Sequence, residues 1–417
     1  MKCGHKIKFW RQITYLLIVC CAILMGASLY GQSDIQCILY MAVLLVSEAI
    51  IVLDAIASHG IQLEHLRKWA VYVIIIMMVY LVSGFATSHF GSNGLKAFLV
   101  VLSISPLFFS AVASAEELNE FARIAVTAVA VLAASSLILW IAGPITQLIS
   151  FNCQIENRWN PEGELSGFYQ GYFGLLYQTQ WQQIGSLAIV RNTGIYAEGP
   201  MYVYVLVIAL AIKVFYLPKK GKITSLLLAL TILSTLSVTG VAATVLIYGL
   251  KILTSKSSRI SKKQKITLLV TVALLALFGL SNLILAKLRT PSGNIHFDDY
   301  RACFLAWINN PIFGIGFSND SDLISYMSTF RMDNTGYSNT LPYVMATGGL
   351  LYLTVWAGTL SAYILIRDSH HVCFGIVAAF LLFTTAAATL FTTALILSFG
   401  AYLLISNRVC VGTQRNS

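Results

Sequence analysis

Long apolar runs recur along nearly the whole sequence and constrain the fold more than any other feature. The chain of 417 residues is 57% hydrophobic and only 11% charged, whereas soluble domains carry about 25% charged residues. Apolar runs of about 18 or more residues with few charges are typical of membrane-spanning helices. The sequence therefore predicts an all-α integral membrane protein that crosses the bilayer many times.

About twelve such segments can be read from the sequence. The paired segments within 223–253 and within 372–406 are short for full crossings, so each pair is expected to form either tilted spans or a re-entrant hairpin. Counts of ten or eleven spans are the alternatives. The predicted segments are 12–30, 35–57, 69–88, 95–113, 121–142, 200–217, 223–238, 240–253, 266–286, 340–365, 372–387 and 389–406.

The positions of lysine and arginine give the orientation, because short cytoplasmic loops carry an excess of both residues. With the amino terminus in the cytoplasm, 20 of the 27 fall on the inner side and 7 on the outer side. The outer seven are Lys96, Arg158, Arg191, Lys287, Arg289, Arg301 and Arg331. The net charge of +10 is then a topology signal and a contact with lipid head groups. We expect both termini in the cytoplasm and no nucleic-acid partner.

Two long loops interrupt the apolar segments, and both are external in this orientation. They divide the chain into helices one to five (1–142), a first long loop (143–199), helices six to nine (200–286), a second long loop (287–339) and the last helices with a cytoplasmic tail (340–417). The two loops hold about a quarter of the residues and most of the acidic ones. The chemistry is therefore expected on the outer face.

The first candidate stretch, R-N-T-G-I-Y-A-E-G-P at 191–200, directly precedes an apolar segment. Arg191 offers a planar guanidinium suited to phosphate. Glu198 comes just before a helix amino terminus, near the positive end of its dipole. The alternative is an interfacial anchor, in which the arginine sits at the membrane edge and the carboxylate caps the helix.

Three further stretches combine polar residues with glycines. D-D-Y-R-A-C-F-L-A-W-I-N-N-P-I-F-G-I-G-F (298–317) predicts an amphipathic helix on the bilayer surface followed by a tight turn. Y-S-N-T-L-P-Y-V-M-A-T-G-G-L-L-Y-L (337–353) predicts a span whose glycine pair allows close helix packing. L-S-T-L-S-V-T-G (233–240) predicts a polar turn between spans. Each of the three also has a purely structural interpretation, as an interfacial helix, a helix cap with a packing motif, or hydroxyls bonded to helix carbonyls.

In this order the four stretches resemble motifs of the O-antigen polymerase and O-antigen ligase superfamily, which are bacterial inner-membrane glycosyltransferases. That family shows an arginine before a G-[IF]-x-x-E-P-like segment, an S-x-[ST]-[RG] turn, an R-x5-W-x3-P-x-x-G-x-G segment and a [HS]-N motif with a glycine-rich helix. The matching residues are Arg191, Gly194 and Glu198, then Ser237, Thr239 and Gly240, then Arg301, Trp307, Pro311, Gly314 and Gly316, and last Ser338, Asn339, Gly348 and Gly349. The resemblance covers about residues 185–355, and it extends in plan to the lipid-dependent, metal-independent glycosyltransferases of GT-C type.

The resemblance implies a polymerase that moves a growing glycan from undecaprenyl diphosphate to a lipid-linked repeat unit at the periplasmic face. Arg191 and Arg301 would stabilise the leaving diphosphate. Glu198 is the first choice of base for the acceptor hydroxyl and Asp299 the second. Six residues are assigned to substrate binding: Tyr196, Trp307, Ser338, Asn339, Arg289 and Arg158. A chain-length regulator and a flippase are the expected protein partners.

Two other functions are alternatives. An O-antigen ligase would transfer finished glycan to another acceptor, but the ligase branch typically has a histidine where this chain has Ser338. A transporter or flippase of lipid-linked oligosaccharide is expected to show paired repeats and broken helices near the midplane. No repeat is visible in the sequence, and the polar cluster is external.

We predict no metal and no other cofactor. Asp320-Ser321-Asp322 has the D-x-D form that nucleotide-sugar enzymes use for Mg²⁺, but it lies in an external loop. The eight cysteines show no metal-ligand spacing. Cys153 and Cys303 lie one in each long loop, and their pairing is left open.

Two carboxylates of the second apolar segment stand apart from these motifs. Glu48 and Asp54 would be costly inside the bilayer. They indicate either an ion pathway, or a protonated or paired Glu48 with Asp54 near the cytoplasmic interface.

Overall fold

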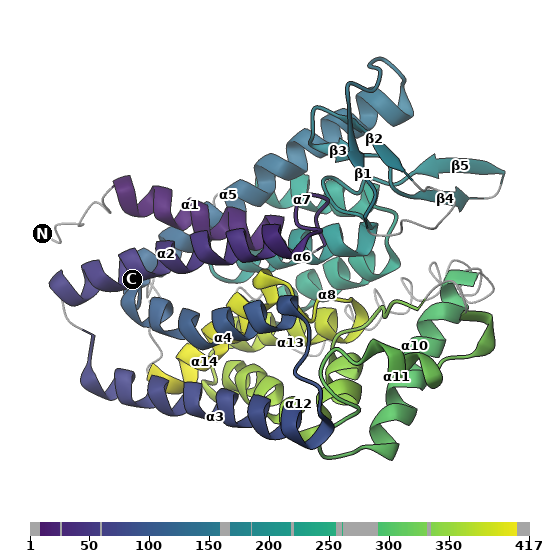
Figure 1. The fold of residues 1–417 in the computed structure, drawn as a ribbon. Helices are drawn as coiled ribbons and strands as arrows, with labels where there is room; N and C mark the ends of the chain where they lie inside the picture. Colours follow the sequence, from purple (N-terminus) through teal and green to yellow (C-terminus); the bar gives the residue numbers. More distant parts are fainter. Residues whose placement is uncertain are drawn as a thin grey trace, which may run out of the picture.

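The computed structural model describes residues 9–25, 27–58, 61–158, 167–184, 186–217, 221–255, 261, 291–331 and 335–406. The predicted segment 266–286 and the predicted ligand Arg289 lie outside the described residues. Helices run side by side in a bundle, with the strands, α10 and α11 at one end (Figure 1). Helix α1 begins and α14 ends toward the opposite end.

Eleven apolar helices form the described part of the bundle. Five are long and apolar enough to cross a membrane: α2 (Asp34–Ser58), α3 (Leu63–Thr87), α4 (Asn93–Ala111), α5 (Ala115–Trp140, continued by the π turn η1, Ile141–Ile145) and α12 (Leu341–Leu365). Six are shorter: α1 (Phe9–Leu24), α6 (Gly199–Phe215), α7 (Lys222–Ser234), α8 (Val238–Thr254), α13 (Ser369–Thr384) and α14 (Phe391–Ser406). The predicted helical membrane protein is confirmed at this level. The count of twelve spans stays a prediction.

The sides of helices α2 and α3 that face away from the bundle are apolar. Leu53, Ile74 and Met78 expose 65%, 60% and 55% of their surface. Large apolar side chains exposed together are unfavourable in water but match the hydrocarbon of a bilayer. The surface is therefore consistent with a lipid environment.

Hydrogen bonds between distant segments show that successive helices run in opposite directions. At the end with the strands, three of them join the loop ends: Leu29 N–H to Ile195 O, Asn192 N–H to Ser234 O and Thr340 N–H to Leu382 O. At the other end the contacts are Arg11 with Asp54, Lys251 with the Val214 carbonyl, and Tyr216 with His371. If successive helices alternate in direction, the two helix ends joined by each of these contacts lie at the same end of the bundle, as observed. Asp54 therefore lies at the end expected to be cytoplasmic, where it pairs with Arg11.

The first long loop contains short strands, which were not predicted from the sequence. It contains β1 (Cys153–Glu156), β2 (Phe168–Tyr172), β3 (Leu176–Tyr177), β4 (Trp181–Ile184) and β5 (Leu187–Val190). These form two antiparallel sheets, β1-β2-β3 and β4-β5. The turn after β2 places Phe173 and Gly174 at φ 51° and 68°, and two adjacent positive φ values suit a hairpin. The alternating exposure of β1 and β2 is the period-two pattern that could have predicted the strands.

The second long loop contains α10 (Pro291–Asn309), α11 (Asp320–Ser325) and the 3₁₀ turn η2 (Thr329–Arg331). The predicted amphipathic helix corresponds to α10, which packs on α12. Ala302, Cys303 and Ala306 are buried on one face. Phe304 and Ile308 are about half exposed on another. Short side chains on the buried face let α10 lie close to the bundle.

Helix α12 is broken at Gly349, where φ is 61° and ψ is −164°. The chain from 311 to 316 fills the break: the N–H groups of Ile315 and Gly316 donate to the carbonyls of Ala346 and Thr347. A Cβ on Gly349 would lie 2.3 Å from the Ile312 carbonyl oxygen. The predicted role of the glycine pair in helix packing is therefore wrong at Gly349, because the partner is a loop backbone. Such irregular backbone is tolerated in a membrane protein when other protein groups satisfy it.

Candidate functional site

Arg191 follows β5 and lies against the amino terminus of α6. Its Nε donates to the Thr235 carbonyl oxygen at 2.8 Å, so the first and fourth candidate stretches meet here. A Cβ on Gly199 would lie 2.6 Å from a terminal guanidinium nitrogen of Arg191. The glycine that separates Glu198 from Pro200 therefore makes room for the guanidinium. Burial lowers the pKa of Arg191, and the charge of Glu198 opposes that shift.

Glu198 is the residue immediately before the first turn of α6, but its side chain does not cap the helix. The N–H of Gly199 instead donates to Gln180 Oε1 at 3.0 Å. Glu198 is half-buried and close enough to Arg191 to support that guanidinium's charge. A carboxylate thus stands beside a positively charged group, and the roles of phosphate ligand and base stay predictions.

Residues between Arg191 and Glu198 are held rigidly. Asn192 is fully buried, and its amide donates to Ser234 Oγ at 2.9 Å. Thr193 Oγ1 donates to the Tyr177 carbonyl at 3.0 Å. Gly194 has φ 55° and packs on the ring of Tyr202, where a Cβ would approach to 2.9 Å. These contacts connect Arg191 to β3, α6 and α7 and so preorganise it.

Arg301 lies on α10 with 48% of its side chain exposed. Its guanidinium is 3.4 Å from Asp298 Oδ1 and from the Tyr326 carbonyl. Asp298 also accepts hydrogen bonds from the N–H of Ser328 at 2.9 Å and from its hydroxyl at 2.5 Å. Burial opposes the charge of Asp298, but the Ser328 bonds and the two neighbouring arginines outweigh it and lower the pKa of the carboxyl group.

Asp299 points into the protein rather than toward the outer face. Its Oδ1 lies 2.6 Å from Arg331, and the two side chains are 0% and 2% exposed. Burial raises the pKa of Asp299, although Ser338 and Arg331 oppose the shift. The prediction of Asp299 as a second candidate base is not supported, because a fully buried, ion-paired carboxylate cannot reach an acceptor hydroxyl.

Arg331 was missed as a site residue by sequence reasoning. It was used only to assign topology, yet it also contacts Asp298 at 3.6 Å and donates to the Gly336 carbonyl at 2.7 Å. The signal was present, because cations are rare in the external loops. Only the folded chain shows that this arginine is a buried partner of both aspartates.

Ser338, Asn339 and Trp307 belong to the second long loop, with Trp307 on α10. Ser338 lies beside Asp299, and Asn339 is fully buried with its Oδ1 3.9 Å from Cys303 Sγ. Asn339 Nδ2 and Trp307 Nε1 have no hydrogen-bond partner among the described residues. Asn339 therefore keeps an unused donor beside Cys303, which adjoins the cluster of aspartates and arginines, and Trp307 keeps one further along α10.

Two other predicted substrate ligands do not join the site. Tyr196 is 1% exposed, stacks on Tyr202 and donates to the Ile23 carbonyl at 3.1 Å. Its ring faces are therefore occupied by the core, and the prediction of sugar stacking is not supported. Arg158 is half exposed and pairs with Glu156 at 2.6 Å. Cys153 and Cys303 are both free thiols.

The structure also bears on the possible metal site and on Glu48. Among the described residues no group of histidine, cysteine and carboxylate side chains could hold a metal ion. Glu48 is fully buried, and its Oε1 accepts a hydrogen bond from Ser105 at 2.7 Å. Glu48 thus has a neighbouring-helix partner, the structural alternative to an ion pathway.

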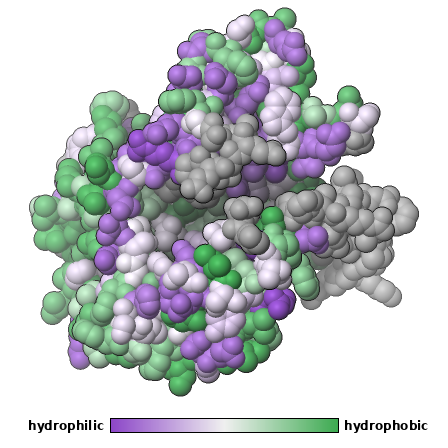
Figure 2. Space-filling model, turned by 45° about the vertical axis from the view of Figure 1, so that its right-hand side comes forward, coloured by the Kyte–Doolittle hydropathy of each residue, from purple (hydrophilic) through white to green (hydrophobic). Residues whose placement is uncertain are grey.

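The end of the bundle that carries the strands, α10 and α11 is hollowed between an upper and a lower lobe (Figure 2). The upper lobe is at the height of the strands, next to which Arg191 lies, and the lower lobe is at the height of α10 and α11. Hydrophilic residues gather along the walls of the hollow. The strands and the helices α10 and α11 thus lie on opposite sides of this hollow.

No family model matches the sequence, and no curated protein matches it either. The chemistry of the site therefore rests on its residues and their geometry.

Proposed function

We propose that the protein is a bacterial surface polysaccharide polymerase of the inner membrane, with about twelve spans, cytoplasmic termini and a periplasmic active site. It would transfer a growing glycan from undecaprenyl diphosphate to the non-reducing end of a lipid-linked repeat unit. The observation that carries the proposal is Arg191, held by the Thr235 carbonyl beside Glu198 at the outer end of an apolar bundle.

The position of Arg191 suits a lipid head group. Helix α6 begins at Gly199 and has 17 residues, which span about 25 Å at 1.5 Å per residue. The hydrocarbon core of a bilayer is about 30 Å thick. An arginine at the start of this helix would therefore lie at or slightly below the outer boundary, where the diphosphate of a polyprenyl lipid is found.

The chemistry follows from the two groups at the start of α6. The oxygen of the acceptor hydroxyl attacks the anomeric carbon of the donor glycan and forms the new glycosidic bond. The bond from that carbon to the diphosphate oxygen breaks, and the diphosphate leaves with its electron pair. Glu198 accepts the proton of the hydroxyl. Arg191, with Arg301 from the other lobe, stabilises the negative charge that develops on the leaving group.

Deletion of the gene followed by electrophoresis of surface glycans tests the proposal against its alternatives. A polymerase predicts glycans of one repeat only. Full-length glycan that is not attached to its final acceptor would instead indicate a ligase. Loss of the surface glycan, with no lipid-linked units reaching the periplasm, would indicate a flippase.

Purified protein in lipid nanodiscs provides the direct assay. Lipid-linked repeats extracted from the polymerase-deficient host should be polymerised by the wild type and not by Arg191→Ala. Retention of full activity by Arg191→Ala would refute the assigned role of this residue. Unchanged glycans in the deletion strain would refute the function itself.

A further inference from the structure

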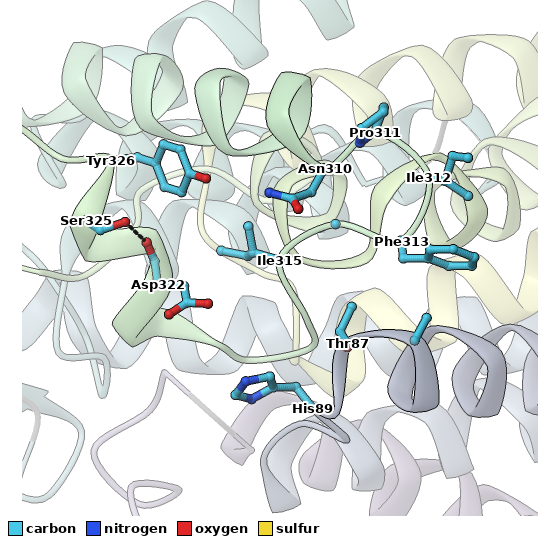
Figure 3. A pocket seen from close by; sticks show the side chains of 12 residues that line it. Thr87, His89, Asn310, Pro311, Ile312, Phe313, Ile315, Asp322, Ser325 and Tyr326 are labelled. Carbon is cyan, nitrogen blue, oxygen red and sulfur yellow. Dashed lines mark hydrogen bonds between the residues drawn. The ribbon is translucent and has the colours of Figure 1, made fainter.

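A polar cavity of about 700 Å³ opens between the outer end of α3, the loop at 310–315 and α11 (Figure 3). Neither Arg191 nor Glu198 lines it. Arg301 does not line it either, but its guanidinium lies 3.4 Å from the backbone oxygen of Tyr326, a lining residue. The volume lies within the range of about 300–1,000 Å³ that is usual for small-molecule sites.

The polar lining of the cavity is rich in neutral donors and acceptors. Asn310 and Tyr326 lie on one side of the open space, and His89 and Asp322 lie on the other (Figure 3). No lysine or arginine is among the described residues that line it. The carboxylate of Asp322 is therefore the main charged group, and the cavity disfavours anionic ligands.

A buried amide holds two of these groups in place. Asn319 is only 3% exposed, and its Nδ2 lies 2.7 Å from Asp322 Oδ2 and 3.2 Å from His89 Nε2. The same nitrogen donates to the Ile315 carbonyl at 2.8 Å, so its two hydrogens go to Ile315 and Asp322. Asp322 is thereby held as an acceptor, and a ring nitrogen of His89 lies beside it.

The wall opposite α3 is equally rigid. Leu350 and Leu351 donate from beyond the break in α12 to the carbonyls of Pro311 and Ile312 at 2.9 and 3.1 Å. A Cβ on Gly314 would come within 2.5 Å of the Ala346 carbonyl oxygen. The loop is thereby fastened into the broken helix, and its backbone gives the cavity a fixed shape.

We propose that this cavity binds one uncharged or amino sugar of the lipid-linked glycan, an inference that rests on the proposed polymerase function. Sugar hydroxyls both donate and accept, so they match a carboxylate, an amide, an imidazole and a phenol arranged around one space. Uronic acids and phosphorylated sugars are excluded by Asp322 and the absence of a lining cation in the described chain. Because Arg301 contacts the backbone of the lining residue Tyr326, a sugar bound here would lie on the side of the proposed diphosphate site that Arg301 supplies.

The test measures binding of a free saccharide to the whole protein in nanodiscs by isothermal titration. The probe is the repeat-unit oligosaccharide released from the host's own lipid carrier by mild acid. Asp322→Asn removes the charged acceptor and is expected to weaken binding about tenfold or more, the usual effect of losing a charge-assisted hydrogen bond. Ser325→Trp fills the cavity and should abolish binding.

Two variants serve as controls. Asp34→Asn makes the same substitution at an exposed outer-face carboxylate, which accepts a hydrogen bond from Asn93, and should bind as the wild type does. Arg191→Ala should also bind the saccharide normally although it does not polymerise. If Asp322→Asn and Ser325→Trp both bind like the wild type, or if a uronic acid binds as tightly as the uncharged sugars, the cavity is not the sugar site.

The two proposals fail separately. Suppose that polymerisation needs Arg191, and that Asp322→Asn and Ser325→Trp change neither polymerisation nor saccharide binding. That result would refute the cavity inference and leave the polymerase proposal standing. Saccharide binding that depends on Asp322, in a protein whose deletion leaves cellular glycans unchanged, would remove only the polymerase.

Discussion

The two long outer segments hold their arginines by different means. In the first, Arg191 donates to a neutral backbone carbonyl, and Glu198 is the nearby carboxylate that affects its charge. In the second, Arg301 and Arg331 face Asp298 and Asp299, so two positive charges meet two negative ones. A backbone carbonyl orients the guanidinium of Arg191 without neutralising it, whereas Arg301 and Arg331 are held by ion pairs with carboxylates. Arg191 should therefore dominate the chemistry, and the second cluster should mainly stabilise the fold and orient Arg301.

The strongest test of this comparison is Arg331→Met. The substitution leaves Asp299 buried without its cation, and breaking a buried ion pair from one side costs about 3–5 kcal/mol. We expect a large fall in the thermal unfolding midpoint in detergent. Arg158→Met is the control, since its exposed pair with Glu156 should contribute only about 0–1 kcal/mol. Equal midpoints for the two variants would contradict a buried structural cluster.

The next effect concerns the rate of polymerisation. Arg191→Ala should lower the single-turnover rate by about 10²–10³-fold, the usual loss when a preorganised donor to a developing anion is removed. Arg301→Ala should lower it only about tenfold, because Asp298 already neutralises part of its charge. Both variants should be extracted and eluted as the wild type is. A larger loss for Arg301→Ala than for Arg191→Ala would reverse the comparison.

The substitution Gly199→Ala tests the position of the Arg191 side chain while keeping the arginine. The added methyl group would lie 2.6 Å from the guanidinium, so the arginine must move from the Thr235 carbonyl. We expect about a tenfold lower rate, since small displacements from productive geometry are costly. Gly358→Ala is the matched control, because a Cβ there meets nothing within 4 Å. Equal rates for the two alanine variants would show that the close contact with Gly199 has no catalytic importance.

The smallest expected effect depends on pH. The pKa of Asp298 is lowered in the fold, so its contribution to stability is fully present above the ordinary aspartate pKa of about 3.9 and is lost as the pH falls through the lowered value. Ser328→Ala removes a hydrogen bond to this carboxylate and should cost about 1 kcal/mol at pH 7. The difference between the variant and the wild type should shrink below about pH 4. A difference that does not vary between pH 7 and pH 3 would show that Asp298 is not the partner that matters.

Sequence patterns located some features well and others poorly. The apolar runs correspond to eleven described helices, because hydrophobic length is a local property of the chain. Arg191 and Glu198 were found from their place before an apolar segment. The burial of Asp299 and Tyr196 could not be found this way, because each depends on a partner far along the chain, Arg331 or Ile23.

The strands of the first long loop show a second kind of limit. Their alternating pattern is short, with four or five residues in the longer strands, so the segment was predicted only as a loop. Hydrogen bonding between neighbouring strands stabilises them where the sequence pattern alone is too short to predict them. The β1-β2-β3 sheet rests on the outer ends of α1 and α5, through Tyr30 with Tyr177 and contacts of α5 with β3.

The amino-acid sequence by itself determined that the chain is an apolar helical bundle with its polar groups concentrated in two segments, because transfer of apolar residues from water depends on composition and length. Only the tertiary structure decided which polar groups face the hollow and which are buried as ion pairs. It also decided that α12 breaks at Gly349, where the 311–316 backbone supplies the missing hydrogen bonds. Such choices depend on contacts between residues far apart in the sequence, and no local pattern contains them.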